Sequence, residues 1–118
     1  RVYAAADVAV LTSDNEGMPV SLIEASLSGL PSVTTNVGSA GEVVVNGVTG
    51  RVVEAKAGSV ANALVEILRD EDLRSSMGEA AKKHSERAFG VDRLVGDHEV
   101  LYRRLISGRL TGRRRTRR

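Results

Sequence analysis

Residues 8–35, VAVLTSDNEGMPVSLIEASLSGLPSVTT, hold the segment that decides the fold. Residues 8–13 form a short apolar run rich in β-branched side chains, which is typical of a buried strand in a parallel sheet. The polar residues 14–17 and then Pro19 break this run into a loop. Residues 32–35 are a second β-branched run, so the segment predicts two strands with a connection between them.

The connection between these strands is predicted to contain a helix over residues 21–28. Ser21 and Glu24 have the spacing of a capping box, in which each side chain satisfies a backbone N–H at the start of a helix. Gly29 stands where a helix often ends with a glycine, and Pro31 prevents the helix from continuing.

The next residues repeat this order of elements. Residues 38–41, Gly-Ser-Ala-Gly, form a second glycine loop, residues 42–45 are predicted as one helical turn, and residues 51–53 as a third short strand. Alternating strands and helices indicate an α/β fold with a short parallel sheet and flanking helices. Ligands of such sheets bind at the carboxyl ends of the strands, where both glycine loops fall.

The second half of the chain predicts three helices and therefore a helical C-terminal portion. The first has Ser59 as its expected N-cap, and the second opens on the acids of residues 70–72 and runs to about Arg87. The third covers residues 91–106. One face of the third helix carries Leu94, Val95, His98, Leu101, Tyr102 and Leu105, and its leucines are expected to be core residues.

Composition excludes several classes of protein. The chain has 118 residues, 42% of them hydrophobic, which suits one globular domain or a piece of one and excludes disorder along its whole length. It has no Cys, so disulfides and cysteine-based metal sites are excluded. No apolar run is long enough to span a membrane, and no signal peptide is recognised. The first residue is Arg, and we expect the sequence to be a fragment.

The net charge of +2 conceals an uneven distribution. Residues 103–118 hold eight of the 17 basic residues and no acid, which leaves nine basic against 15 acidic residues in the body. The body is therefore acidic, and no domain-wide basic footprint for nucleic acid is present. Residues 108–118 are predicted to be a disordered Arg-rich tail.

A longer series of motifs points to a family. Residues 13–25 read SDNEGMPVSLIEA, with two glutamates separated by seven residues, and GLPSV (29–33), VGSAGEVV (37–44) and NGVTG (46–50) follow in order. This series, over roughly residues 1–105, resembles the C-terminal half of retaining, nucleotide-sugar-dependent glycosyltransferases of the GT-B fold, group 1 or family 4 type. The resemblance implies that residues 1–107 are a partial, Rossmann-like nucleotide-sugar-binding domain.

The resemblance also implies roles for individual residues. Glu16 occupies the position that contacts the donor sugar and that we regard as catalytic, and Glu24 the position that binds the ribose hydroxyls of the nucleotide. The backbone between them lies against the sugar and diphosphate in the family, which makes candidates of Gly17, Met18, Val20 and Ser21. Pro19 departs from the small residue usual there and has no N–H to offer.

Simpler interpretations remain open for the same residues. Glu24 could complete a capping box with Ser21, and Glu16 could be a solvated surface acid. Gly38 and Gly41 could serve only a tight turn, and Glu42 could be the first-turn acid of a short helix. His84 and His98 receive no functional role.

The family pattern has parts that this sequence does not contain. The acceptor-binding N-terminal half, and the Arg and Lys that stabilise the departing diphosphate, would precede residue 1. We therefore expect the chain alone to be inactive, and its exposed sheet edge to make it marginally stable or prone to associate. The resemblance implies neither a metal nor a covalent cofactor, only a nucleoside diphosphate sugar as donor.

The expected function is transfer of a hexose from that donor to a glycan or lipid acceptor, in the cytoplasm or peripherally at the inner membrane face. One alternative is a sugar-nucleotide epimerase of the same architecture. Another is a non-catalytic remnant or binding module that acts through its basic tail, for example by weak contact with anionic lipid. No specific nucleic-acid partner is expected.

Overall fold

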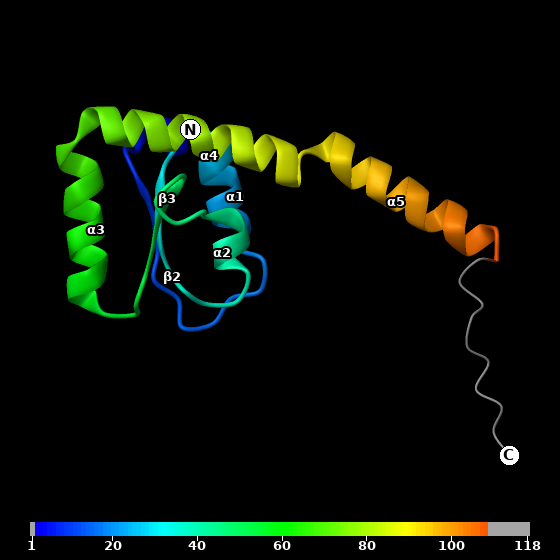
Figure 1. The fold of residues 1–118 in the computed structure, drawn as a ribbon, viewed down its shortest axis with the longest axis horizontal. Coiled ribbons are helices and arrows are strands. Elements are labelled where there is room, and N and C mark those ends of the chain that lie inside the picture. The colour runs from blue at the N-terminus through cyan, green and yellow to red at the C-terminus, as the bar shows by residue number, and fades with distance from the viewer. Residues whose placement is uncertain (1, 109–118) are drawn as a thin grey trace, which may run out of the picture. The chain divides into compact units, whose positions relative to one another are not determined.

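The computed structural model describes residues 2–108, which fall into two compact units divided between Ala88 and Phe89. The first unit begins with a 3-10 turn, η1, which the sequence did not predict. It then alternates strands with helices, as predicted (Figure 1). Its elements are η1 (Tyr3–Ala5), β1 (Ala9–Leu11), α1 (Val20–Leu27), β2 (Ser32–Thr35), α2 (Ala40–Val43), β3 (Gly50–Val53), α3 (Ala57–Arg69) and α4 (Glu71–Phe89), of which the last residue belongs to the second unit. The second unit contains α5 (Val91–Ile106).

The three strands form one parallel sheet in the order β1-β2-β3. Val10 pairs with Val33, which in turn pairs with Arg51. All four residues of β2 are buried, because β2 has a strand on each side and helices on both faces. The second edge of β1 pairs with no strand among the described residues, and Val10 is 45% exposed.

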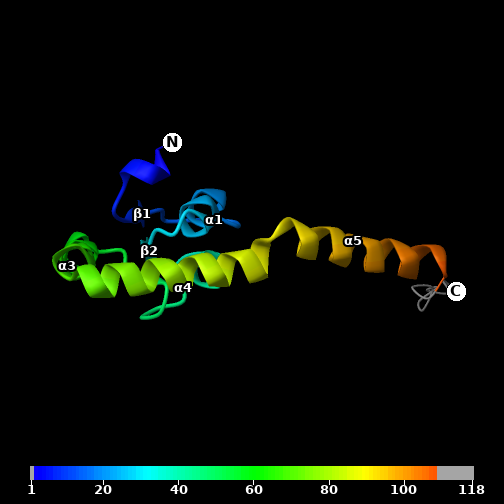
Figure 2. The ribbon, with the colours of Figure 1, turned by 90° about the horizontal axis from the view of Figure 1, so that it is seen from above.

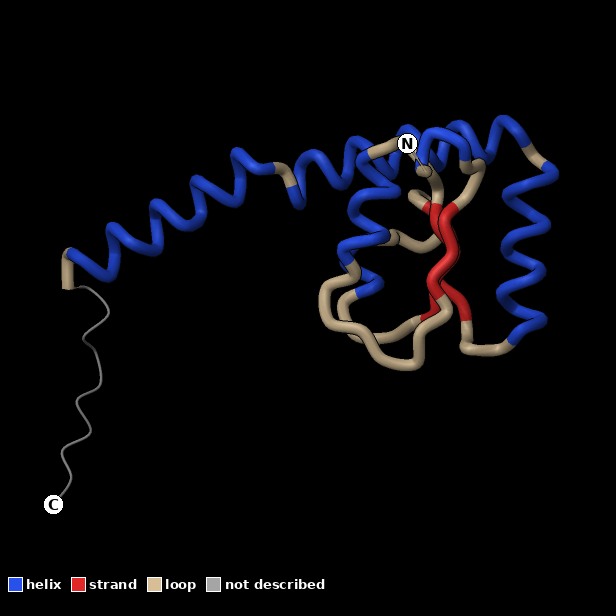
Figure 3. Tube along the Cα trace, turned by 180° about the vertical axis from the view of Figure 1, so that it is seen from behind, coloured by secondary structure: helices blue, strands red, loops and turns tan. Residues whose placement is uncertain are grey.

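Helices cover both faces of this sheet. α1 and α2 lie on one side of the strands and α3 on the other (Figure 3). α4 runs along the amino ends of the strands, as the view from above also shows (Figure 2). The core joins the sheet to α3 and α4 through the buried side chains of Val33, Ala63, Ile67 and Met77.

The predicted N-caps of α1 and α3 and the predicted start of α2 were wrong. α1 begins at Val20 with Pro19 as its N-cap, so Ser21 lies inside the helix and forms no capping box with Glu24. Proline suits a helix start because its missing N–H would have no partner there. α3 begins at Ala57 rather than after Ser59, and α2 covers Ala40–Val43 rather than residues 42–45. Glu42 does lie in the first turn of α2.

The predicted end of α1 is confirmed. Gly29 has a positive φ of 81°, and the N–H of Leu30 reaches back 3.0 Å to the carbonyl of Ala25. The N–H of Gly29 donates to the carbonyl of Ser26 over 2.9 Å. These two bonds form a Schellman motif, which satisfies carbonyls at the helix end and turns the chain into β2.

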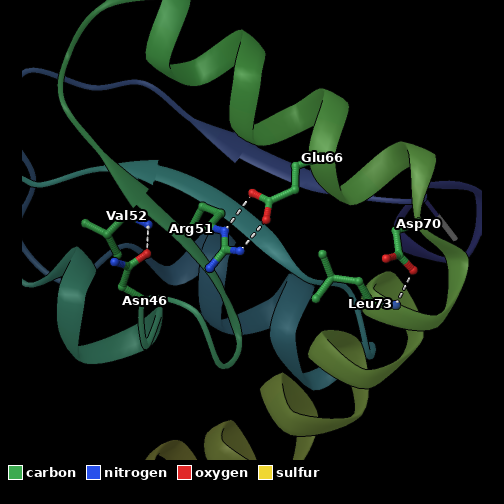
Figure 4. A network of polar contacts seen from close by, with 6 residues as sticks. All are labelled: Asn46, Arg51, Val52, Glu66, Asp70 and Leu73. Atoms are coloured by element: carbon green, nitrogen blue, oxygen red, sulfur yellow. Dashed lines mark hydrogen bonds and ion pairs between the residues drawn. The ribbon is translucent and has the colours of Figure 1, made fainter.

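An ion pair joins β3 to α3. The Arg51 guanidinium donates to Glu66 through Nε over 2.9 Å and through Nη2 (Figure 4). The hydrogen bond from Arg51 holds the pKa of Glu66 below its ordinary value, and the same bond raises the pKa of Arg51. Both side chains are partly exposed, so the pair links β3 to α3 but contributes little to stability.

Asp70 caps α4. Its Oδ1 accepts a hydrogen bond from the N–H of Leu73 over 2.9 Å (Figure 4). Asp70→Ala is expected to lower the free energy of unfolding by about 1 kcal/mol, because that N–H loses its partner. Urea denaturation of the chain measures the change. Asp70→Asn retains an acceptor and is the matched control; an equal loss in both variants would contradict the assignment.

α5 has the predicted bounds but buries nothing among the described residues. Leu94, Leu101 and Leu105 are about half exposed, at 57%, 48% and 50%, so the expectation that they are core residues is wrong for this chain. No helix in residues 2–108 is long and apolar enough to cross a membrane. The expected disordered tail begins at Gly108, and the rest of it, 109–118, lies outside the described residues.

Candidate functional site

The candidate site lies at the carboxyl ends of β1 and β2. The loop of residues 12–19 follows β1 and that of residues 36–39 follows β2, and both emerge at the same end of the sheet (Figure 3). The buried Thr35 donates through Oγ1 to the carbonyl of Ser13 over 2.7 Å. The end of β2 therefore holds the first loop in place.

Gly38 lies close against the backbone of the first loop. Its φ is +50°, and a Cβ there would overlap the carbonyl oxygen of Glu16 and lie 2.7 Å from the carbonyl carbon. The N–H of Ser39 donates to the carbonyl of Gly17 over 3.2 Å. Only glycine fits this conformation and this space, so Gly38 supports the backbone that carries Glu16.

Glu16 is held by its own loop. Ser13 donates through Oγ to Oε1 of Glu16 over 2.6 Å, and the Glu16 side chain is half-buried. Within residues 2–108 its Oε2 accepts no hydrogen bond, so one carboxylate oxygen is oriented and the other is available. Glu16 is thus a partly exposed acid with one oriented oxygen.

The other residues predicted between the two glutamates face solvent. Gly17 and Ser21 are exposed, Met18 is 42% and Val20 61% exposed, while Pro19 is buried. The carbonyl of Pro19 accepts from Leu22 over 3.1 Å and from Ile23 over 3.3 Å. The N–H groups of Val20 and Ser21 open the helix and have no acceptor within it.

Glu24 lies in the middle of α1 and contacts a residue that sequence reasoning missed. The Tyr3 hydroxyl donates to Oε2 of Glu24 over 2.9 Å and lies 3.4 Å from the carbonyl of Ser21. This hydrogen bond raises the pKa of Tyr3. No local pattern signals the contact, because 21 residues separate the two partners and only the packing of η1 against α1 joins them.

The predicted site residues therefore fall into two groups. Gly38 lies against the backbone of Glu16 and Gly17 at the strand ends. Glu24, on α1, instead accepts a hydrogen bond from Tyr3 of η1. Gly41 and Glu42 belong to α2, where the carbonyl of Glu42 lies 2.9 Å from Nε2 of His84. No three His, Asp or Glu side chains among residues 2–108 gather in a way that could hold a metal ion.

A cleft of about 420 Å³ lies between the strand ends and the start of α3. None of the predicted site residues lines it. Its walls are mostly apolar, with Thr12, Asp14, Thr35 and Lys56 as the polar members.

Comparison with known proteins identifies relatives of this chain. A family model described as "Glycosyl transferases group 1" matches residues 1–84. The N-acetyl-alpha-D-glucosaminyl L-malate synthase of Bacillus anthracis is 32% identical over 103 residues, which cover 86% of this chain and 27% of that protein.

Two solved structures share the fold. HepE of Anabaena, crystallised in complex with UDP-glucose, is 26% identical with a TM-score of 0.79, over 86% of this chain and 29% of that one. The C-terminal domain of the glycosyl transferase group 1 protein LpcC from Francisella tularensis is 26% identical with a TM-score of 0.68, over 76% of this chain and 47% of that one. This chain thus spans about a quarter of the length of the B. anthracis synthase and HepE.

Proposed function

Because the chain belongs to the glycosyl transferases group 1, with the fold of their C-terminal GT-B domain, we propose that it is the donor-binding part of a hexosyltransferase. Its donor is a nucleoside diphosphate sugar, and its acceptor is a glycan or lipid bound by the half of the enzyme that this chain does not contain. The observation that carries the proposal is the contact of Gly38 with the Glu16–Gly17 backbone, which holds an acidic loop at the carboxyl ends of the strands.

Glu16 is proposed to bind the donor sugar and to act in transfer. A carboxylate accepts hydrogen bonds from sugar hydroxyls, and bonds to a charged acceptor are the stronger kind. Ser13 already orients Oε1, so the group needs little further ordering when the sugar binds. The N–H groups of Val20 and Ser21 offer donors for the diphosphate at the start of α1.

Glu24 is proposed to accept hydrogen bonds from the vicinal hydroxyls of the ribose. Its side chain is exposed, so a nucleotide can reach it. HepE was crystallised with UDP-glucose, which makes UDP-glucose the first donor to test here. GDP and ADP carry the same ribose and diphosphate and are tested beside UDP.

We further propose that the isolated chain binds the donor without turning it over, and that binding needs no metal. Transfer requires electrostatic stabilisation of the departing diphosphate, and in the family pattern an Arg and a Lys before this segment supply it. Binding of the nucleotide is accordingly expected to be unchanged by EDTA. Product formed by the pure chain at a rate that Glu16→Ala abolishes would contradict the proposed inactivity.

Titration calorimetry tests the assignment of Glu16. Glu16→Gln is expected to weaken UDP-glucose binding about tenfold, because the stronger charge-assisted hydrogen bonds to the sugar are lost. Binding of UDP itself should not change, since UDP lacks the glucose that Glu16 would contact. Equal weakening of both ligands would place Glu16 on the nucleotide instead, and no effect on either would remove it from the site.

A further inference from the structure

Tyr3 is a conspicuous polar neighbour of the site with no role so far. It lies in η1, before β1, and its hydroxyl reaches α1 at Glu24 Oε2 over 2.9 Å. The ring is half-buried and lines a cleft of about 230 Å³ together with residues of β1 and α1, among them Val8, Val10 and Leu22. The hydroxyl itself is exposed, and its hydrogen bond to Glu24 joins η1 to α1.

A hydrogen bond at this position restrains a flexible group. An exposed glutamate samples several rotamers, and a ligand that needs one of them must first immobilise the side chain. Tyr3 holds Oε2 of Glu24, while Oε1 of Glu24 accepts no hydrogen bond within residues 2–108. One carboxylate oxygen is thus anchored to the protein and the other is available to a ligand.

The chemistry of tyrosine suits this task. A phenol donates one hydrogen bond and carries no charge, so it restrains the carboxylate without neutralising it as Lys or Arg would. Its pKa is raised above the ordinary value by the hydrogen bond to Glu24, so the hydroxyl keeps its proton throughout the neutral range.

We propose that Tyr3 is a positioning residue for the ribose, one that holds Glu24 by Oε2 so that Oε1 is oriented to accept from the 2′- and 3′-hydroxyls of a nucleoside diphosphate. The inference rests on the proposed function, because it presupposes that Glu24 meets the ribose. It differs from a purely structural role, in which the Tyr3 hydroxyl would only attach the N-terminal turn to α1.

The test compares two ligands with two variants. The affinity of the chain is measured for UDP, or for GDP or ADP if one of these binds more tightly, and for its 2′,3′-dideoxy analogue. Tyr3→Phe keeps the ring and removes only the hydroxyl. It is expected to weaken binding of the ribonucleotide about three- to tenfold, the cost of immobilising one side chain. Binding of the dideoxy analogue should be unchanged, because that ligand makes no bond to Glu24.

Glu24→Ala is the second variant, and it tests whether Tyr3 acts through Glu24. In that background Tyr3→Phe should have no further effect on ribonucleotide affinity, since there is no carboxylate left to position. If Tyr3→Phe weakens binding of both ligands equally, Tyr3 has a structural role and the inference is wrong. The inference is also wrong if the affinity for both ligands is unchanged. Unchanged binding of the dideoxy analogue also shows that the variant is folded.

The two proposals fail in different ways. If wild-type chain binds the ribonucleotide no better than its dideoxy analogue, or Glu24→Ala has no effect, the role of Glu24 is wrong and the inference falls with it. If Glu24→Ala acts on the ribonucleotide alone but Tyr3→Phe does not, only the role of Tyr3 is wrong.

Discussion

Gly38→Ala is expected to lower the free energy of unfolding by about 3 kcal/mol and to reduce donor binding at the same time. The new methyl group would overlap the carbonyl oxygen of Glu16, and backbone cannot move aside as a flexible side chain can. The residue would also sit at a φ of +50°, which side chains rarely adopt. The loop that carries Glu16 must therefore shift or the conformation of residue 38 must change.

Urea denaturation and calorimetry with UDP-glucose together measure this effect. Gly41→Ala is the matched control, because a Cβ at Gly41 meets nothing within 4 Å and the residue lies in α2. It should leave stability unchanged or raise it by up to about 1 kcal/mol. If Gly38→Ala behaves like Gly41→Ala, the close contact between the two loops does not hold the site.

Glu24→Ala is expected to weaken nucleoside diphosphate binding about 30-fold. Two hydrogen bonds from a ribose diol to a carboxylate contribute about 2 kcal/mol, and about 1.4 kcal/mol corresponds to a tenfold change in affinity. Stability should change little, since Glu24 is exposed. The loss should be confined to ligands with both ribose hydroxyls.

The control for this variant is an acid of the same kind elsewhere on the first unit. Glu79 lies on α4, where it faces Lys83 over 3.9 Å, and Glu79→Ala should leave nucleotide affinity unchanged. Equal losses in both variants would mean that the overall negative charge, and not the position of Glu24, governs binding. No loss in Glu24→Ala would contradict its role at the ribose.

Local signals in the sequence predicted most of the elements. Apolar β-branched runs predicted the three strands. Gly29 with Pro31 marked the end of α1, because glycine readily adopts the positive φ of a helix end and proline cannot continue a helix. The starts of α1 and α3 were less predictable. Ser21 and Ser59 are good capping residues, but Pro19 and Lys56 hold the N-cap positions because the packing of each helix on the sheet sets where it begins.

The candidate site, too, was predictable in part from local sequence and in part only from the tertiary structure. The sequence by itself determined the family resemblance, the glutamates at positions 16 and 24, and the glycine loops at the strand ends, since these depend on residue type and order. Only the tertiary structure decided that Gly38 supports the Glu16 backbone and that Tyr3 holds Glu24. Both contacts join elements that are distant in the sequence, and these elements come together only when the sheet and its helices have assembled.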